Sequence, residues 1–529
     1  MRSKKLQVWQ PFLFALVMVV GMAIGFQLSN KTLGNKLFSS NKSSSVQEVV
    51  ELINSKYVDK FQKDSINQLA IEELLTHLDP HSIFIPAKYL NRVNDDLKGQ
   101  FQGIGIEFQQ FNDTLNVMYV LPGSPAEKAG LQAGDQFIKI NGISEVAGKN
   151  VGADSIRKLL RGETGSSVKI TLLRDGMLKD VMVARANIPV STIDAAYVME
   201  DKKTGYIRIN KFGERTYEEF MQSLEGLQKK GTTQLIIDLR GNGGGFLNEA
   251  VQIADEFIDG NKMIVYTQGD KSAKTEYTAK RPGIFEKGKV VVLIDESSAS
   301  ASEVLAGALQ DWDRATIIGR RSFGKGLVQQ QFGLSDGSAL RLTIARYYTP
   351  LGRNIQKPYN KNREEYENDL VERVQHGELT IGDTSKPKGK PYKTPAGKTV
   401  YGGGGITPDV FVPIDTTAYA DFQFPLYRKN TLVKFVYHLF KENSKLFKQQ
   451  KNTETLEKVF SPGQKEWQQF LQFAAKDSIN LSKATSAQQT DLLKRMQSLM
   501  ARQIWRTEGY FELVNKNDAV IKTALSSLR

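Results

Sequence analysis

The chain has 529 residues, of which 40% are hydrophobic and 24% charged, and its formal net charge is +13. This composition is typical of folded, water-soluble domains, and the length predicts about three to four of them. Because cysteine is absent, disulfides, cysteine zinc sites, a cysteine nucleophile and acylation on cysteine are excluded. The positive charge raises the question of nucleic acid, but the sequence has no zinc-finger spacing, basic zipper or RNA-binding signature. We therefore expect no nucleic-acid partner, and a solvated basic surface that can face anionic lipid.

The N-terminus carries an apolar run from Trp9 to Leu28, interrupted only by two glutamines and preceded by three basic residues. The run is near the ~20 residues that span a bilayer, and the basic residues should stay in the cytoplasm. A cleaved signal peptide is the alternative, but no clear A-x-A site follows and the run is long for a signal sequence. We expect residues 1–28 to anchor the protein in the cytoplasmic membrane, with its body on the extracytoplasmic, periplasmic side.

A polar segment and a helical segment follow the apolar run. Residues 29–45 are rich in Ser, Asn and Lys and are predicted to be a linker. Residues 46–96 are predicted to be helical, because apolar residues recur from Val46 to Tyr57 at helical spacing. The sequence Leu-Asp-Pro-His-Ser at 78–82 interrupts that pattern.

Residues 97–185 are predicted to form a small β-rich module. Its pattern alternates short strands with turn signals, including an Asn-Gly pair at 141–142 that is typical of a hairpin. The predicted strands are 104–108, 115–120, 136–140 and 167–173, and the predicted helices are 124–130 and 153–161.

Residues 186–415 are predicted to form an α/β body, because apolar strands alternate with amphipathic helices. Such alternation favours right-handed βαβ units and a sheet covered by helices. The predicted strands are 206–209, 234–239, 263–266 and 290–294, and the predicted helices are 217–230, 247–257 and 301–310. Residues 357–398 are polar and are predicted to be a surface insertion. Residues 416–529 are predicted to be a helical C-terminal extension, in which we find no chemical motif.

Residues 297–303, Ser-Ser-Ala-Ser-Ala-Ser-Glu, follow a predicted strand and begin a predicted helix. Ser300 and Glu303 have the spacing of a capping box, and read alone this structural interpretation is the stronger one. A serine at the N-terminus of a helix nevertheless lies where backbone N–H groups favour developing negative charge. Ser300 is therefore a candidate nucleophile that requires a base.

The base is not an obvious histidine. The chain has four histidines, and none lies between residues 200 and 350: His77, His81, His376 and His438. Only His81 could complete a Ser-His-Asp triad, and a structural role in its turn is favoured. Lysine can replace histidine when burial lowers its pKa. Lys325 lies between two glycines in Phe-Gly-Lys-Gly, although an exposed hairpin lysine is the stronger interpretation of that segment alone.

Two further features could support such a site. Gln329 follows Lys325 by four residues, so on a strand both side chains would face the same way and the amide could orient the amine. The glycines at 241–245 follow a buried strand and precede a helix, and they could supply one oxyanion N–H opposite that of Ala301. A tight strand-to-helix turn is an equally good interpretation of these glycines.

Taken together, the segments resemble the carboxyl-terminal processing (tail-specific) serine protease family with a PDZ domain. The resemblance covers about residues 46–412, in family order, and each motif is weak alone. The matching segments are 78–82, the PDZ-like module, 238–245, 300–303, 323–329, 348–356 and 404–409. The chain departs from the family pattern at the 357–398 insertion and after about residue 415.

The resemblance implies a multidomain α+β and α/β fold with a protease core of the crotonase-like type. It implies a serine endopeptidase that cleaves proteins near or from their C-termini through a Ser300–Lys325 dyad, with Gln329 assisting the lysine and no metal or cofactor. Ala301, Gly243 and Gly244 would supply oxyanion donors, and Glu303 would support the site.

The PDZ-like module implies that substrate C-termini are the partners. An extended tail can add as a strand, with its carboxylate held by backbone N–H groups. The residues at that position are Phe101, Gly103, Ile104, Gly105 and Ile106. The C-terminal extension could mediate self-association or bind an adaptor. The competing interpretation is a membrane-tethered PDZ scaffold with an inactive protease body, against which the intact Ser300, Lys325 and Gln329 argue.

Overall fold

The structure is a computed structural model, and it divides the chain into two compact units, residues 1–73 and 74–529. It describes residues 14–22, 45–60, 62–111, 113–142, 144–146, 151–359, 363–382, 389–416 and 422–529. The first unit contains a helix at 14–22, α2 (Ser45–Lys56) and most of α3 (Lys63–Thr76). Most of the predicted anchor lies outside the described residues. Within the described ranges, no helix is long and apolar enough to cross a membrane.

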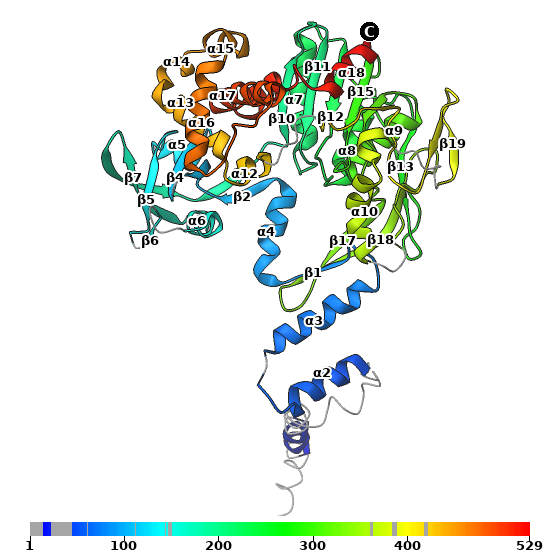
Figure 1. Cartoon of the computed structure of the whole chain (residues 1–529). Coiled ribbons are helices and arrows are strands. Elements are labelled where there is room, and N and C mark those ends of the chain that lie inside the picture. The colour runs from blue at the N-terminus through cyan, green and yellow to red at the C-terminus, as the bar shows by residue number, and fades with distance from the viewer. Residues whose placement is uncertain are drawn as a thin grey trace, which may run out of the picture. The chain divides into compact units, whose positions relative to one another are not determined.

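The second unit is built around a six-stranded sheet in the order β10-β11-β12-β15-β16-β21 (Figure 1). The edge strand β10 is antiparallel to β11 and all other pairs are parallel, as expected from the βαβ alternation. Its strands are β10 (Ile193–Val198), β11 (Thr204–Ile209), β12 (Gln234–Asp238), β15 (Lys289–Ile294), β16 (Thr316–Gly319) and β21 (Val410–Phe411).

The two faces of this sheet bury different elements, because successive side chains along a strand point to opposite faces. One face carries residues such as Ile237 and Val292 and packs against three helices, α7 (Thr216–Lys229), α8 (Leu247–Asp255) and α9 (Ala301–Asp311). The other face carries Ile236 and Val291 and packs against α18 (Ala519–Leu528). The last helix of the predicted C-terminal extension therefore completes the core of the α/β body.

A second sheet lies in the order β1-β18-β13-β14, with β17 also paired to β18. The predicted strand at 263–266 is β13, and it belongs to this sheet rather than to the parallel one. Its strands are β1 (Ile83–Ile85), β13 (Met263–Gln268), β14 (Thr275–Thr278), β17 (Leu327–Gly333) and β18 (Ala339–Tyr348). The β17–β18 hairpin carries Gln329, and Lys325 lies two residues before β17.

The small β module has its own sheet, in the order β3-β4-β5-β7-β8, and its own apolar core around Phe137 and Ile170. Antiparallel pairing of β2 (Gln100–Gly103) with β9 (Ala186–Pro189) brings its two chain ends together. The helix α4 (Ala87–Lys98) precedes it. Its other elements are β3 (Ile106–Phe111), β4 (Thr114–Val120), α5 (Pro125–Lys128), β5 (Gln136–Ile140), β6 (Ser144–Glu145), α6 (Ala153–Leu160), β7 (Ser167–Arg174) and β8 (Met177–Ala184).

The predicted insertion and extension are mostly helical. Within the insertion, most residues of α10 are exposed, and two side chains of this surface helix, Tyr366 and Arg373, are buried. The insertion contains α10 (Arg363–Gln375), α11 (Glu378–Ile381) and a hairpin of β19 (Pro391–Lys393) with β20 (Thr399–Tyr401).

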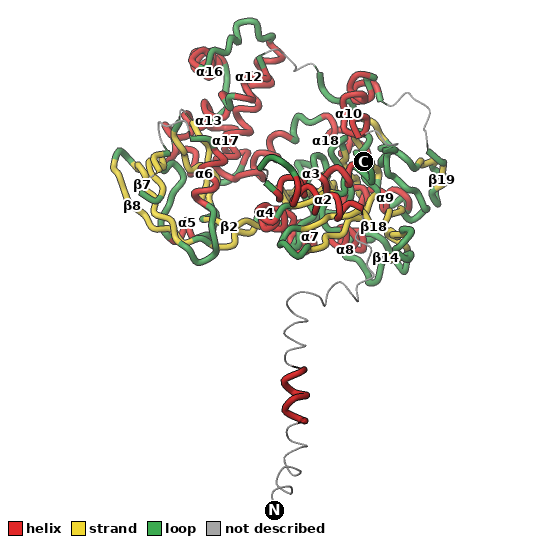
Figure 2. Tube along the Cα trace, turned by 90° about the horizontal axis from the view of Figure 1, so that it is seen from below, coloured by secondary structure: helices red, strands yellow, loops and turns green. Residues whose placement is uncertain are grey.

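The extension forms a lobe with its own apolar core, whose helices appear red in Figure 2. Its helices are α12 (Gln423–Arg428), α13 (Thr431–Glu442), α14 (Ser444–Lys448), α15 (Thr453–Val459), α16 (Gln464–Lys476) and α17 (Ser486–Val514).

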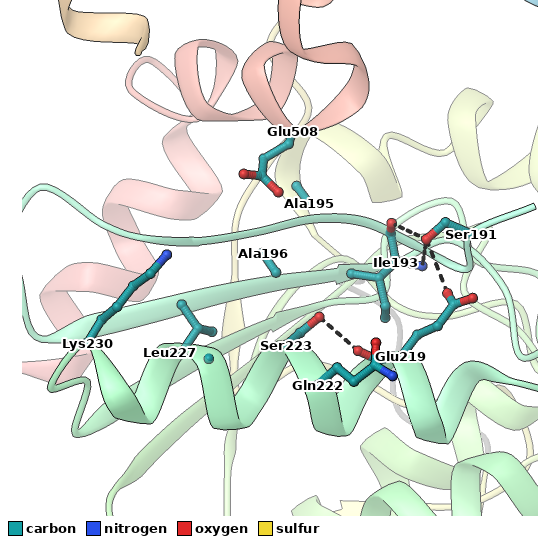
Figure 3. Close-up of a pocket in the computed structure, with 11 residues that line it drawn as sticks. Ser191, Ile193, Ala195, Ala196, Glu219, Gln222, Ser223, Leu227, Lys230 and Glu508 are labelled. Atoms are coloured by element: carbon teal, nitrogen blue, oxygen red, sulfur yellow. Dashed lines mark hydrogen bonds between the residues drawn. The ribbon is translucent and has the colours of Figure 1, made fainter. Parts of the chain in front are cut away.

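A cavity of about 380 Å³ lies between β10, α7 and α17 (Figure 3). Glu219 on α7 accepts hydrogen bonds from Ser191 and from the N–H and hydroxyl of Thr192, and so fixes the start of the edge strand. The cavity contains neither Ser300 nor Lys325 in its lining, so it is not the site predicted from sequence.

The packing of α18 on the sheet predicts that Ile521→Ala destabilises the α/β body. Ile521 is 1% exposed, and removing a buried isoleucine side chain costs about 2–5 kcal/mol. Thermal unfolding followed by calorimetry should show a lower midpoint for Ile521→Ala than for Ser527→Ala, which changes an exposed residue of the same helix. Equal midpoints would show that α18 does not contribute to this core.

Candidate functional site

The serine-rich loop between β15 and α9 places its serines in different environments. The hydroxyl of Ser298 donates to the Leu239 carbonyl at 2.8 Å, and that of Ser302 donates to the Asn242 carbonyl at 2.9 Å. Ser300 has φ 55° and ψ −113°, a conformation that residues other than glycine rarely adopt. Backbone strain of this kind is concentrated at functional sites.

Ser300 and Glu303 have the predicted capping-box spacing, but only one of the two hydrogen bonds of a capping box is present. The Glu303 carboxylate accepts from the Ser300 N–H at 2.8 Å, as a capping box requires. In the other direction, the Glu303 N–H donates to the Ser300 carbonyl at 2.9 Å rather than to its hydroxyl. The cap therefore does not use the serine oxygen that the predicted chemistry needs.

The buried Glu303 carboxylate joins the serine loop to the lysine loop. Its Oε2 atom accepts from the N–H groups of Ser300 and Lys325, both at 2.8 Å. Its Oε1 atom accepts from the Gly324 N–H at 2.7 Å and the Ser322 hydroxyl at 2.5 Å. Burial raises the pKa of Glu303, and the four donors oppose that shift. Glu303 thus holds the serine loop and the lysine loop together through hydrogen bonds to both.

Tyr347 on β18 makes a second connection between the same two loops. Its side chain is buried, and its hydroxyl contacts the Ser300 carbonyl at 3.1 Å and donates to the Lys325 carbonyl. Sequence reasoning did not identify Tyr347, because an apolar strand gives no signal of what its tyrosine will contact.

The Lys325 side chain is held by Gln329, as predicted. Lys325 Nζ donates to Gln329 Oε1 at 3.0 Å. Gln329 Nε2 in turn donates to the His81 carbonyl at 2.5 Å, so the Leu-Asp-Pro-His-Ser turn fixes the orientation of the amide. Asp79 holds that turn by accepting from the His81 and Ser82 N–H groups.

The surroundings of Lys325 disfavour its charged form. Burial, followed by the nearby Arg341 guanidinium, lowers the pKa of Lys325 below its ordinary value. The carboxylates of Asp79 and Glu303 act in the opposite direction without cancelling the shift. A buried lysine with a lowered pKa can serve as a general base near neutral pH.

His81 is close to Lys325 but is occupied by another contact. Its Nε2 atom lies 2.7 Å from the Tyr366 hydroxyl of α10. Burial and the charge of Lys325 lower the pKa of His81 to about 4, so its ring is neutral at pH 7. The Lys357 amine lies over the rings of Tyr366 and Phe323, at 4.1 and 4.2 Å from their centroids. These contacts among His81, Tyr366 and Lys357 support the structural role predicted for His81.

The glycine loop lies directly against the serine loop. A Cβ atom added to Gly244 would lie 2.7 Å from the Ala299 carbonyl oxygen and 2.8 Å from the Ser300 Cβ, and φ at Gly244 is +97°, so only glycine fits. The Gly244 N–H already donates to Asn242 Oδ1 at 2.9 Å, which makes it unavailable as the predicted oxyanion donor in this structure. Gly243 is exposed beside it, and Ala301 is the first residue of α9.

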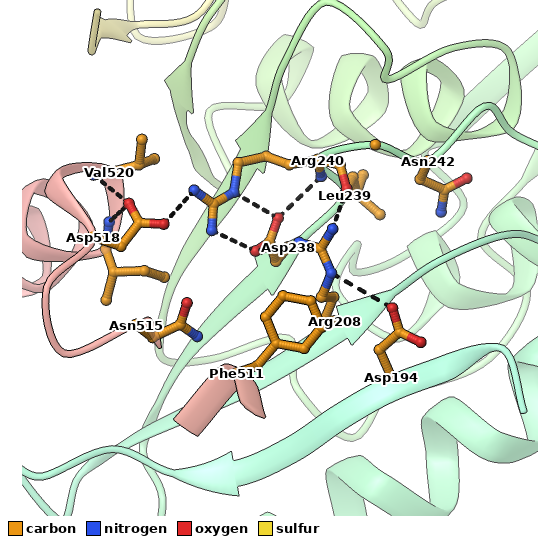
Figure 4. Close-up of polar contacts among 12 residues, drawn as sticks. Asp194, Arg208, Asp238, Leu239, Arg240, Asn242, Phe511, Asn515, Asp518 and Val520 are labelled. Carbon is orange, nitrogen blue, oxygen red and sulfur yellow. Dashed lines mark hydrogen bonds and ion pairs between the residues drawn. The ribbon is translucent and has the colours of Figure 1, made fainter. Parts of the chain in front are cut away.

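A charged network fixes the strand end that leads into this glycine loop (Figure 4). Arg208 and Arg240 both bond to Asp238, at 2.8 and 2.7 Å, and Arg240 also pairs with Asp518 at the start of α18. Although burial acts to raise it, the two guanidinium groups hold the pKa of Asp238 well below its usual range. The ring of Phe511 on α17 lies 4.4 Å from the Arg208 guanidinium.

The predicted tail-binding residues lie in the small module, on β2, the following loop and the start of β3. Gly105 has φ +85°, and its carbonyl accepts from the Leu121 N–H at 3.0 Å. Phe101 pairs with Ile188 across the β2–β9 ribbon. In the part of the chain that the structure describes, no cluster of His, Asp and Glu side chains could hold a metal ion.

Comparison with known proteins identifies three regions of the chain. Residues 203–362 match peptidase family S41, residues 117–174 match the PDZ domain, and residues 424–506 match a family of unknown function. Ser300 and Lys325, the predicted nucleophile and base, are therefore both within the first match, and the small module contains the second.

Curated relatives cover most of these regions. The carboxy-terminal-processing protease of Bartonella bacilliformis is 33% identical over 380 residues, which are 70% of this chain and 84% of that protein. A probable CtpA-like serine protease of Staphylococcus aureus (strain COL) is 35% identical over 325 residues, and the match spans 64% of that relative's length and 61% of this chain.

Among solved structures, the photosystem II D1 C-terminal processing protease is 27% identical. The match covers 70% of this chain and 88% of that one, with a TM-score of 0.37. The sequence relatives are decisive, since one of them exceeds 30% identity over most of its length. The chain belongs to peptidase family S41, as a PDZ-containing member of the carboxyl-terminal processing serine proteases.

Proposed function

We propose that the protein is a serine endopeptidase that cleaves proteins near or from their C-termini, with Ser300 as nucleophile and Lys325 as general base. The observation that carries the proposal is the shared Glu303 carboxylate, which binds the N–H groups of both residues at 2.8 Å. Strain at Ser300 and the lowered pKa of Lys325 add independent support.

The reaction is acyl transfer. Neutral Lys325 accepts the hydroxyl proton of Ser300 while Oγ bonds to the carbonyl carbon of the scissile peptide. The C–N bond then breaks, and protonated Lys325 donates its proton to the leaving amine. Water attacks the resulting ester, Lys325 again accepts a proton, and the carboxylate product leaves with the Ser300 hydroxyl restored. Gln329 keeps the amine oriented through both steps, since its own amide is fixed by the His81 carbonyl.

The tetrahedral intermediates carry negative charge on the former carbonyl oxygen. We assign its stabilisation to the N–H of Ala301, at the N-terminus of α9, and to that of Gly243 in the facing glycine loop. Gly244 serves a different purpose, because its missing side chain lets the two loops approach and its N–H fixes Asn242. Loss of one such donor typically costs about 10²–10³ in rate.

The PDZ domain supplies a place for the substrate tail. Its strand β3 is an edge strand, paired to β4 on one side only, so an extended C-terminus can add to the free side. Gly103, Ile104 and Gly105 precede β3, where backbone N–H groups can hold the terminal carboxylate. The alternative is a peptide-binding scaffold without activity. The burial of Lys325 and its hydrogen bond to Gln329 argue against this alternative, because peptide binding alone does not require a buried lysine.

Ser300→Ala tests the enzyme against the scaffold. Degradation of an unstructured protein by the full chain should fall by about a thousandfold or more in this variant, since removal of the nucleophile leaves only binding and oxyanion stabilisation. Ser297→Ala removes an exposed serine from the same loop and should cleave at the wild-type rate. If the wild-type and Ser300→Ala chains are equally inert, the scaffold interpretation is correct.

The pH dependence of cleavage tests the base. The folded-state pKa of Lys325 is lowered, so kcat/KM should rise with pH through that pKa and level off before the ordinary lysine value of 10.5. Arg341 contributes to the lowering, so Arg341→Gln should raise the pKa of Lys325 and move the midpoint to higher pH. Lys465→Gln, a change in the C-terminal lobe, should not move it. An unchanged midpoint in Arg341→Gln would argue against a lysine base.

We also propose that the N-terminal apolar run anchors the body at the outer face of the cytoplasmic membrane. The support is the length of the run from Trp9 to Leu28 and the basic residues before it. The full chain should remain with membranes after alkaline carbonate washing, and a chain lacking residues 1–28 should be released. Release of both chains would rule out an integral anchor.

A further inference from the structure

The first four residues of β3, Ile106 to Gln109, line a groove that the C-terminal lobe helps to form. The groove has a volume of about 350 Å³. Its lining from the PDZ domain comes from β3, from Met118 and Tyr119 on β4 and from Arg157 on α6. The opposite lining comes from the lobe, through Val433 on α13 and through Leu499, Arg502, Gln503 and Arg506 on α17. The strand proposed to receive substrate tails therefore borders a cavity that two parts of the chain build together.

A kink in α17 holds the lobe to β3. Trp505 and Arg506 leave helical geometry, and Arg506 has φ 57° and ψ −142°. The kink directs Arg506 to the Glu107 carboxylate of β3, with which it forms an ion pair. The Arg506 guanidinium also lies 4.6 Å from the centroid of the Tyr119 ring. An arginine held in so uncommon a backbone conformation needs these contacts to offset its strain.

The lobe makes a second contact with the far end of the same strand. Phe111, the last residue of β3, packs against Tyr437 of α13, with ring centroids 5.3 Å apart. Both ends of β3 are thus in contact with the lobe, which fixes the position of α17 over the groove.

The lining of the groove carries a net positive charge, because it contains three arginines and only one carboxylate, that of Glu107. Glu107 is neutralised by Arg506, so it does not oppose the remaining cations. Arg157 lies over the ring of Phe108, and its ion pair with Asp154 is solvent-exposed and correspondingly weak. Arg502 on α17 is exposed and makes no ion pair or hydrogen bond to the residues that the structure describes. It is a cation in the groove lining whose charge is not satisfied by the protein.

The geometry points to a peptide with an acidic side chain as the occupant. A tail added to β3 would alternate its side chains between the two faces of the sheet, at about 3.3 Å per residue. One set would face α6 and the other would face α17. We propose that α17 is a wall of the PDZ peptide groove and that Arg502 selects an acidic side chain within the last few residues of the substrate tail. This inference rests on the proposed function, in which the tail binds at β3.

Peptide binding by the full chain carrying Ser300→Ala tests this inference without cleavage. The probes are fluorescent ten-residue peptides with a free C-terminus and a single Glu or Lys at each of the four positions before the last residue. At one position, fluorescence anisotropy should show Glu binding about tenfold tighter than Lys, an effect that weakens at high salt. In Arg502→Glu the preference should reverse. Lys465→Glu, which makes the same charge change on α16 away from the groove, should leave the wild-type preference intact.

Equal affinity for the Glu and Lys peptides at all four positions would overturn the inference. So would a preference that is the same in Arg502→Glu as in Lys465→Glu, or equal binding of peptides with an amidated C-terminus. These outcomes concern binding alone. Cleavage that survives in Ser300→Ala would instead overturn the proposed function, and it would leave the measured peptide preference unchanged.

Discussion

The arrangement of the site depends on one buried carboxylate. Glu303 is fully enclosed, and such a group is costly to bury unless its oxygens are satisfied. Its four donors come from two segments that are separate in the chain, the serine loop and residues 322–325. Because both Ser300 and Lys325 offer a backbone N–H to the same oxygen, neither loop can shift without leaving a buried charge underpaired. The same hydrogen bonds therefore position the proposed Ser300–Lys325 dyad and stabilise the buried Glu303 carboxylate.

The C-terminal extension is part of the enzyme rather than an appendage to it. The helix α18 covers one face of the parallel sheet, and Asp518 at its start pairs with Arg240 beside the glycine loop. Earlier in the extension, α17 contacts β3 through Arg506 and the sheet through Phe511. The same segment therefore contacts both the PDZ domain and the sheet of the protease body, as would be needed for it to hold the two parts together.

From its periodicity, the sequence predicted strands β11, β12 and β15 and helices α7, α8 and α9 of the α/β body, but not strands β10, β16 and β21. It also predicted the contact between Lys325 and Gln329, although Lys325 precedes β17 rather than lying on it. It could not predict Tyr347 or the His81 carbonyl as partners, since those contacts join residues far apart in the chain. It gave Gly244 a donor role that its bond to Asn242 precludes in this structure. It predicted a surface insertion at residues 357–398 but not the burial of Tyr366 against His81, because no periodic pattern marks a contact with a turn nearly three hundred residues earlier.

Neutral Lys325 is proposed to make Ser300 nucleophilic. This proposal is tested most directly by mass spectrometry of the full chain after reaction with a fluorophosphonate, which phosphonylates activated serines with loss of fluoride. A single adduct is expected, on Ser300, and its rate of formation should rise with pH and fall to background in Lys325→Ala. An adduct on another serine, or an undiminished rate at Ser300 in Lys325→Ala, would contradict it.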